Sequence, residues 1–94
     1  MFIRVVRFTG VDQERVDSLM SDIEGRDGPP EGVPSTGVKF LYDADQGTMV
    51  VLQSYDTAED METGAKVLNA MDAADTPGTR DSVDACEVKL ELSA

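Results

Sequence analysis

The fold is decided by one stretch of the chain, Thr48-Met49-Val50-Val51-Leu52-Gln53-Ser54-Tyr55. Its β-branched and aromatic residues are typical of a strand. Because alternate residues of a strand point to opposite sides, Val50 and Leu52 share one face. Met49 and Val51 share the other. Apolar side chains therefore lie on both faces, and we expect both faces of the sheet to be covered.

The rest of the chain divides into short segments on either side of this strand. Hydrophobic periodicity and turn residues predict a strand over 2–8, a helix that begins after Asp12 and ends before Gly25, a strand over 37–42, a helix from Thr57 to about residue 73, and a strand over 82–92. Residues 43–47 form a hairpin turn that ends in glycine. Residues 26–36 hold three of the four prolines and form a loop.

The order βαββαβ predicts an α+β domain over residues 1–94, with a four-stranded antiparallel sheet and two helices on one face, the ferredoxin-like arrangement. Two helices on one face leave the other face bare. An exposed face that carries apolar side chains would be an unusually large hydrophobic patch. Packing it against the same face of a second copy removes the patch, so we expect a homodimer.

Charge and composition exclude several kinds of partner. The net charge is −11, from 19 acidic against 8 basic residues, and such an acidic surface repels nucleic acid and anionic membranes. The chain has no histidine and one cysteine, Cys86, so the usual metal ligand sets are absent and we predict neither a metal nor a cofactor. We expect Cys86 to be a buried structural thiol, and the absence of a signal peptide indicates a cytoplasmic protein.

Two segments, Met49 to Asp60 and Pro77 to Asp84, resemble the dimeric α+β barrel group that includes the antibiotic-biosynthesis-monooxygenase domains. The resemblance spans essentially the whole chain and implies a ferredoxin-like domain that dimerises into a barrel. The family contains cofactor-independent oxygenases of aromatic substrates, haem-degrading enzymes and members without known activity. Its cavity aromatic matches Tyr55, where active members more often carry tryptophan.

Two departures from the family pattern bear on chemistry. The polar residue that some oxygenases carry four positions before the aromatic falls at Val51, which cannot hydrogen-bond a substrate. Haem-degrading members use a histidine on the second helix, and this chain has none. We therefore expect no haem binding.

The candidate cavity-lining residues are Tyr55, Gln53, Arg4 and Glu87. If their shared face points away from the helices, they converge inside the dimer barrel, where a Tyr or Glu of shifted pKa could transfer protons. Under the alternative interpretation they make ordinary cross-strand pairs, and Tyr55 packs beneath the second helix as core. The sequence does not decide between the two.

Three functions follow as hypotheses. The first is a dimeric α+β barrel protein that binds a small apolar or aromatic molecule in its cavity. The second is a cofactor-independent monooxygenase of an aromatic or polyketide-like substrate. The third is a non-catalytic assembly module with a filled interior. Whether the chain is an enzyme stays open at this point.

Overall fold

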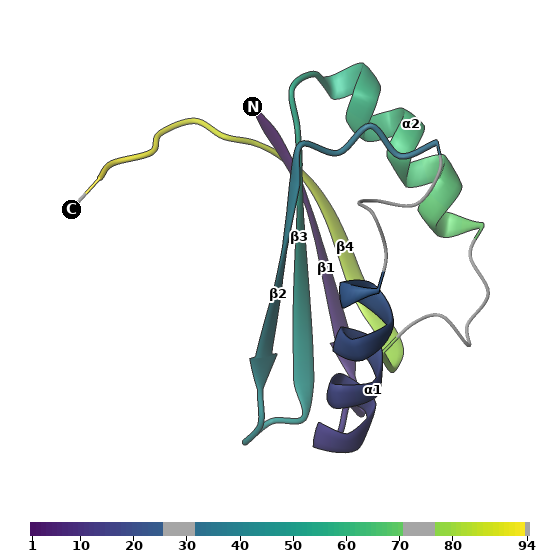
Figure 1. Cartoon of the computed structure of the whole chain (residues 1–94). Coiled ribbons are helices and arrows are strands. Elements are labelled where there is room, and N and C mark those ends of the chain that lie inside the picture. The colour runs from purple at the N-terminus through teal and green to yellow at the C-terminus, as the bar shows by residue number, and fades with distance from the viewer. Residues whose placement is uncertain (26–31, 71–76, 94) are drawn as a thin grey trace.

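The computed structural model describes residues 1–25, 32–70 and 77–93. The elements follow the predicted order: β1 (Phe2–Thr9), α1 (Gln13–Glu24), β2 (Gly37–Asp43), β3 (Thr48–Tyr55), α2 (Ala58–Asn69) and β4 (Thr79–Glu87). The strands form one antiparallel sheet in the order β2-β3-β1-β4, with β1 and β3 at its centre (Figure 1). This confirms an α+β domain whose architecture is compatible with the ferredoxin-like fold.

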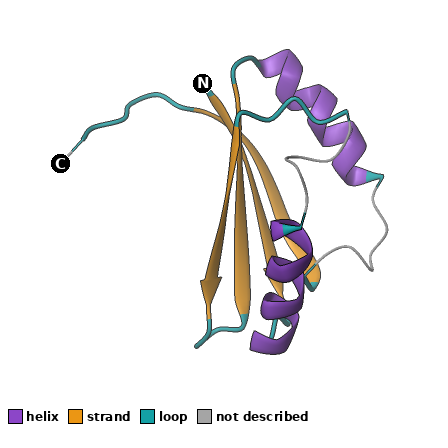
Figure 2. Ribbon diagram, in the orientation of Figure 1, coloured by secondary structure: helices purple, strands orange, loops and turns teal. Residues whose placement is uncertain are grey.

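Both helices lie on the same side of the sheet (Figure 2). The core is formed there by apolar residues of β1, β3, α1 and the segment before α1: Val6, Phe8, Val11, Val16, Leu19, Met49 and Val51. Phe8 pairs with Met49, and Val6 pairs with Val51. Directly opposed residues of antiparallel strands share a face, so these pairs form the floor of the core.

The opposite side, which we call the open face, has no helix on it. Its paired positions are Ile3, Val5, Arg7, Thr9, Gly37, Lys39, Leu41, Asp43, Thr48, Val50, Leu52, Ser54, Thr79, Ser82, Asp84 and Cys86. Leu41 is 48% exposed, and the apolar residues of the two central strands are half-buried by their neighbours. The expectation of one covered and one bare face is met.

The predicted helix starts are confirmed by their caps. The Asp12 carboxylate accepts a hydrogen bond from the backbone N–H of Arg15 at 2.8 Å, and the Thr57 hydroxyl accepts one from Asp60 at 3.1 Å. Such caps satisfy backbone donors that have no partner within the helix. The hairpin turn is confirmed too, because Gly47 has a φ of 62°, a conformation that favours glycine.

Two predictions about the last strand are wrong. β4 ends at Glu87 rather than Leu92, because β1 begins at Phe2 and offers no residue opposite those beyond Val88. Cys86 is exposed rather than buried, because it lies on the edge strand β4, whose residues are exposed on both faces. The predicted end of the second helix, near residue 73, lies outside the described residues. The structure describes α2 as far as Asn69.

Helix α2 docks on the sheet through a contact between a glycine and an aromatic ring. Tyr55 is fully buried, and its hydroxyl oxygen lies 2.5 Å from the position that a Cβ on Gly64 would occupy. Real Cβ atoms do not come this close to another atom. Gly64 therefore lets the helix backbone approach the ring, and any larger residue would push α2 away from the sheet.

We predict that Gly64→Ala lowers the free energy of unfolding by about 1–3 kcal/mol, as overpacked cores do. This sign is informative because Gly to Ala at an ordinary helix position stabilises by about 0.5–1 kcal/mol. Urea unfolding followed by circular dichroism measures the change. Adding Tyr55→Phe, which removes the closest atom, should restore part of the loss. A Gly64→Ala variant as stable as the wild type would contradict the contact.

Candidate functional site

The predicted site residues lie on the helix-covered side of the sheet. Arg4 pairs with Gln53 across β1 and β3 in the same phase as Val6 and Val51 of the core. Tyr55 lies beneath α2. The interpretation that this face points away from the helices is therefore wrong, and the alternative, with Tyr55 packed under the second helix, describes the structure. The reason is that α2 covers this end of β1 and β3.

Arg4 is the centre of a buried polar cluster. Its side chain is 4% exposed, and its guanidinium donates from Nη1 to Gln53 Oε1 at 3.2 Å and from Nη2 to Asn69 Oδ1 at 3.0 Å. Arg80 of β4 donates from Nη1 to the same Asn69 oxygen at 2.8 Å. One neutral amide oxygen thus joins two guanidinium groups, which come from β1 and from β4.

The C-terminal end of helix α2 lies at this cluster. Asn69 is the last residue of α2, where the backbone carbonyls carry the negative end of the helix dipole. The ion pairs within the described residues, Arg7 with Asp81 and Glu87 with Lys89, do not involve Arg4. Burial lowers the pKa of Arg4, the nearby Tyr55 raises it, and Arg80 lowers it further. Two amide oxygens accept from the Arg4 guanidinium, its Nε has no hydrogen-bond partner among the described residues, and no described carboxylate forms an ion pair with it.

The Tyr55 hydroxyl has no hydrogen-bond partner among the described residues. Burial raises the pKa of this phenol, and the Arg4 guanidinium offsets part of the rise. The hydroxyl lies against the α2 backbone at Gly64. In this position the phenol is a core group that stays neutral, and its oxygen points at packed protein.

Glu87 does not join the other three residues. It is exposed, pairs with Phe2 at the end of β4, and its carboxylate lies 3.2 Å from the Lys89 ammonium. Such a surface ion pair contributes little. The structure therefore brings Arg4, Gln53 and Tyr55 together and leaves Glu87 at the solvent edge.

Sequence reasoning missed three residues of this region: Gly64, Asn69 and Arg80. Gly64 carried a usable signal, because a glycine inside a helical pattern costs stability and often marks a close packing contact. Asn69 and Arg80 carried none. Their meeting depends on where α2 ends relative to β4, which spacing along the chain does not specify.

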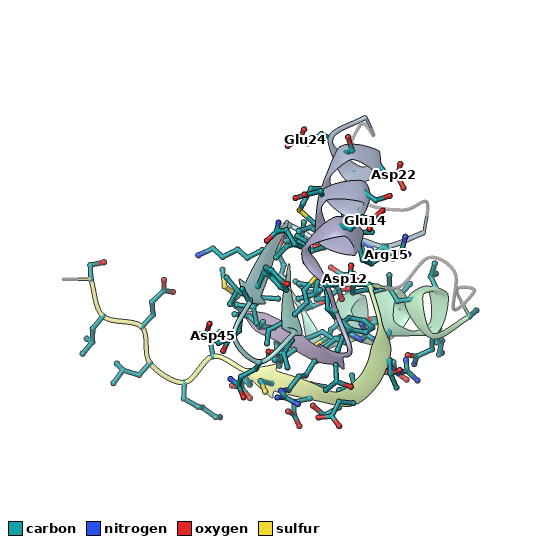
Figure 3. The ribbon with its side chains drawn as sticks, turned by 90° about the horizontal axis from the view of Figure 1, so that it is seen from below. Asp12, Glu14, Arg15, Asp22, Glu24 and Asp45 are labelled. Carbon is teal, nitrogen blue, oxygen red and sulfur yellow. The ribbon has the colours of Figure 1, made fainter. Side chains whose placement is uncertain are left out.

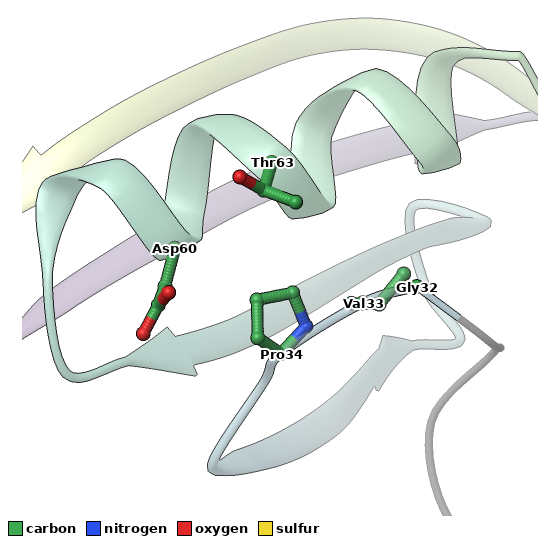
Figure 4. Close-up of a pocket in the computed structure, with 5 residues that line it drawn as sticks. All are labelled: Gly32, Val33, Pro34, Asp60 and Thr63. Carbon is green, nitrogen blue, oxygen red and sulfur yellow. The ribbon is translucent and has the colours of Figure 1, made fainter.

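A shallow groove of about 410 Å³ lies between α2 and the segment that precedes β2 (Figure 4). It is lined by Gly32, Val33, Pro34, Asp60 and Thr63. Asp60 and Thr63 also serve the helix itself, through the Thr57 cap and through a bond to the Glu59 carbonyl. Asp60 and Thr63 are the polar side chains among the described residues that line the groove, and no cysteine, serine or lysine is among them.

The open face differs from the rest of the surface in charge. This face carries two basic residues, Arg7 and Lys39, and two acidic residues, Asp43 at the end of β2 and Asp84. The formal charges at these four positions sum to zero. Counting Asp81, which bonds Arg7 at 2.8 Å, gives −1. The whole chain carries −11. Figure 3 shows acidic side chains that project from α1, including Glu14, Asp22 and Glu24, with Asp22 and Glu24 on opposite sides of the helix.

Two further observations concern metals and membranes. Within residues 1–25, 32–70 and 77–93, no three His, Cys, Asp or Glu side chains gather in a way that could hold a metal ion. Neither helix in the described part of the chain has the length and apolar character needed to span a bilayer.

No family model, curated protein or solved structure matches this chain.

We predict that Tyr55 makes the protein less stable at alkaline pH. The phenol ionises near pH 10 in the unfolded chain and at higher pH in the folded one. Between these two pH values the folded protein keeps a proton that the unfolded chain has lost. The free energy of unfolding therefore falls as the pH rises. Below pH 10 this contribution is constant.

Urea unfolding at a series of pH values, on the wild type and Tyr55→Phe, measures this effect. The variant should lose less stability than the wild type above pH 10. At neutral pH its free energy of unfolding should equal that of the wild type or exceed it by up to about 1 kcal/mol, because the variant does not bury a hydroxyl without a partner. Tyr42→Phe is the matched control and should keep the alkaline loss, since Tyr55 is still present. Equal slopes for wild type and Tyr55→Phe would contradict the assignment.

Proposed function

We propose that this chain works as a homodimer whose two open faces pack together, and that a small apolar or aromatic molecule binds between the two sheets. This is the dimeric α+β barrel that the sequence resemblance implies. The observation that carries the proposal is the open face: its centre is apolar and its charges nearly cancel, on a chain of net charge −11.

The apolar centre supports self-association. Five residues of the open face are large and apolar: Ile3, Val5, Leu41, Val50 and Leu52. Leu41 is exposed and the other four are half-buried, and contiguous apolar patches on a surface mark interaction sites. Around them lie Arg7, Lys39 and Asp84, which gives the apolar core and polar rim of a protein interface.

Side-chain size supports a cavity at one end of this interface. Gly37, Ser54, Ile3 and Cys86 are successive neighbours across the four strands. Three of the four are small. Facing sheets pack about 10 Å apart, with the space filled by interdigitating side chains. In a dimer, these small side chains would leave part of the space between the two sheets unfilled. The neighbouring row holds the larger Leu52 and Val5, which would form a wall of this cavity.

The other hypotheses have less support. The monooxygenase reaction drew on Tyr55 and Gln53, which lie on the helix-covered side, and no observation on the described residues favours it. A filled assembly module would use the same dimer interface without a ligand. The ligand experiment below separates it from the binding protein.

For the dimer, we predict a mass of about twice the chain mass of 10.1 kDa in light scattering at micromolar concentration. Leu52→Lys places a charge in the centre of the open face and should give monomers. Ser18→Lys, at an exposed position of α1, adds the same charge on the helix side and should remain dimeric. A wild type of single-chain mass, or a dimeric Leu52→Lys, would contradict the interface.

For the ligand, we predict that the dimer binds Nile red, a neutral aromatic dye, with an increase in fluorescence. Ser54→Phe should fill the small row and abolish the increase while the dimer persists. Ser54→Ala keeps the space and should bind the dye as the wild type does. A dimeric wild type that leaves the dye dark would contradict ligand binding and favour the assembly module.

A further inference from the structure

Two arginines, which we call the guanidinium pair, meet on the helix side of the sheet at the C-terminal end of α2. Arg4 of β1 and Arg80 of β4 donate to the same side-chain oxygen of Asn69, at 3.0 and 2.8 Å. Two positive side chains therefore converge on one neutral acceptor. Like charges held this close repel, and negative charge between them relieves the repulsion.

The described residues supply little of that negative charge. Their ion pairs join Arg7 to Asp81 and Lys89 to Glu87, and neither involves the guanidinium pair. The C-terminal end of α2 contributes about half a negative elementary charge, which is less than the two positive charges. On a chain with 19 acidic residues, this point of the structure therefore keeps a net positive charge.

One edge of the Arg4 guanidinium is only half used. The Nη2 atom on this edge donates to Asn69, whereas the buried Nε atom beside it has no hydrogen-bond partner among the described residues. Buried donors are normally satisfied. A carboxylate or phosphate group has two oxygens that can accept from both atoms of such an edge at once, and the single oxygen of an amide cannot.

The guanidinium pair is accessible to solvent from the side of β4. Asn69 and Arg80 are exposed. Beyond Arg80 on the helix side of β4, Val83 is 41% exposed, and Ala85, which pairs with Arg4, is exposed as well. Asn69 is the last residue of α2, so its side chain can turn outward without a change in the helix. An incoming group can then take its place between the two guanidinium groups.

We propose that Arg4 and Arg80 form a binding site for a small oxyanion, a carboxylate or a phosphate group, which replaces the Asn69 side-chain oxygen. One oxygen of the anion accepts from Nη2 of Arg4 and from Arg80, and a second accepts from Nε of Arg4. The site lies on the other side of the sheet from the open face, so it does not depend on the proposed dimer or on its ligand.

The test is a titration of the full chain, followed by NMR through the arginine Nε–H signals and the Asn69 side-chain amide. Sodium phosphate, sodium acetate and sodium chloride are added at equal ionic strength near neutral pH. Arg4, Arg80 and Asn69 should show saturable shifts with phosphate, with acetate or with both, and the anion that saturates identifies the class. Arg7, which bonds Asp81, is the internal control and should show no saturable shift.

Four variants test the position of the anion. Arg80→Gln should raise its dissociation constant at least tenfold, and the matched control Arg7→Gln should leave it within twofold of the wild type. Asn69→Ala removes the group that the anion displaces and should bind it at least as tightly as the wild type. Asn69→Asp puts a carboxylate of the chain itself between the guanidinium groups and should abolish binding. Circular dichroism checks that each variant folds.

Three results would overturn the proposal. The first is a wild type without saturable shifts in phosphate and in acetate, or with the same saturation in chloride. The second is an Arg80→Gln variant that binds the anion as the wild type does. The third is an Asn69→Asp variant that keeps wild-type affinity, because the anion would then lie elsewhere than between the guanidinium groups.

Discussion

The structure depends on one constraint: a sheet with two apolar faces has helices for only one of them. β1 pairs with β3 and β4 along most of its length and supplies side chains to both faces. α1 and α2 lie on the same side of the sheet, where Val6, Phe8, Met49 and Val51 contribute to the core. The second face then holds half-buried aliphatic residues that no helix of the described chain covers. The helix-side core and the apolar open face arise from the same strand alternation.

The sequence could predict the elements and their order because local chemistry determines them. Asp12 and Thr57 are capping residues before amphipathic stretches, and both cap their helices. Gly47 ends a turn that needs a positive φ. The strand pattern of 48–55 was also sufficient to predict that both faces are apolar. These features depend on neighbours within a few residues.

The phase of β1 could not be predicted. One face carries Phe2, Arg4, Val6 and Phe8, and the other carries Ile3, Val5, Arg7 and Thr9. Each has one arginine among apolar residues, so hydropathy does not distinguish the buried face. The choice is made by tertiary contacts: Arg4 reaches the end of α2 through Asn69, whereas Arg7 reaches Asp81 at the solvent edge. For this reason the sequence left open on which side of the sheet the candidate residues lie.

Charge decides where a chain of net charge −11 can associate with itself. Exposed acids repel over about 8 Å at physiological ionic strength, so a like-charged pair must keep its acids apart. Glu14, Asp22 and Glu24 are exposed on α1, which lies on the other side of the sheet from the open face. On the open face the four charges at paired positions cancel. The acids of α1 therefore add negative charge to the helix side and leave the open face nearly neutral at its paired positions.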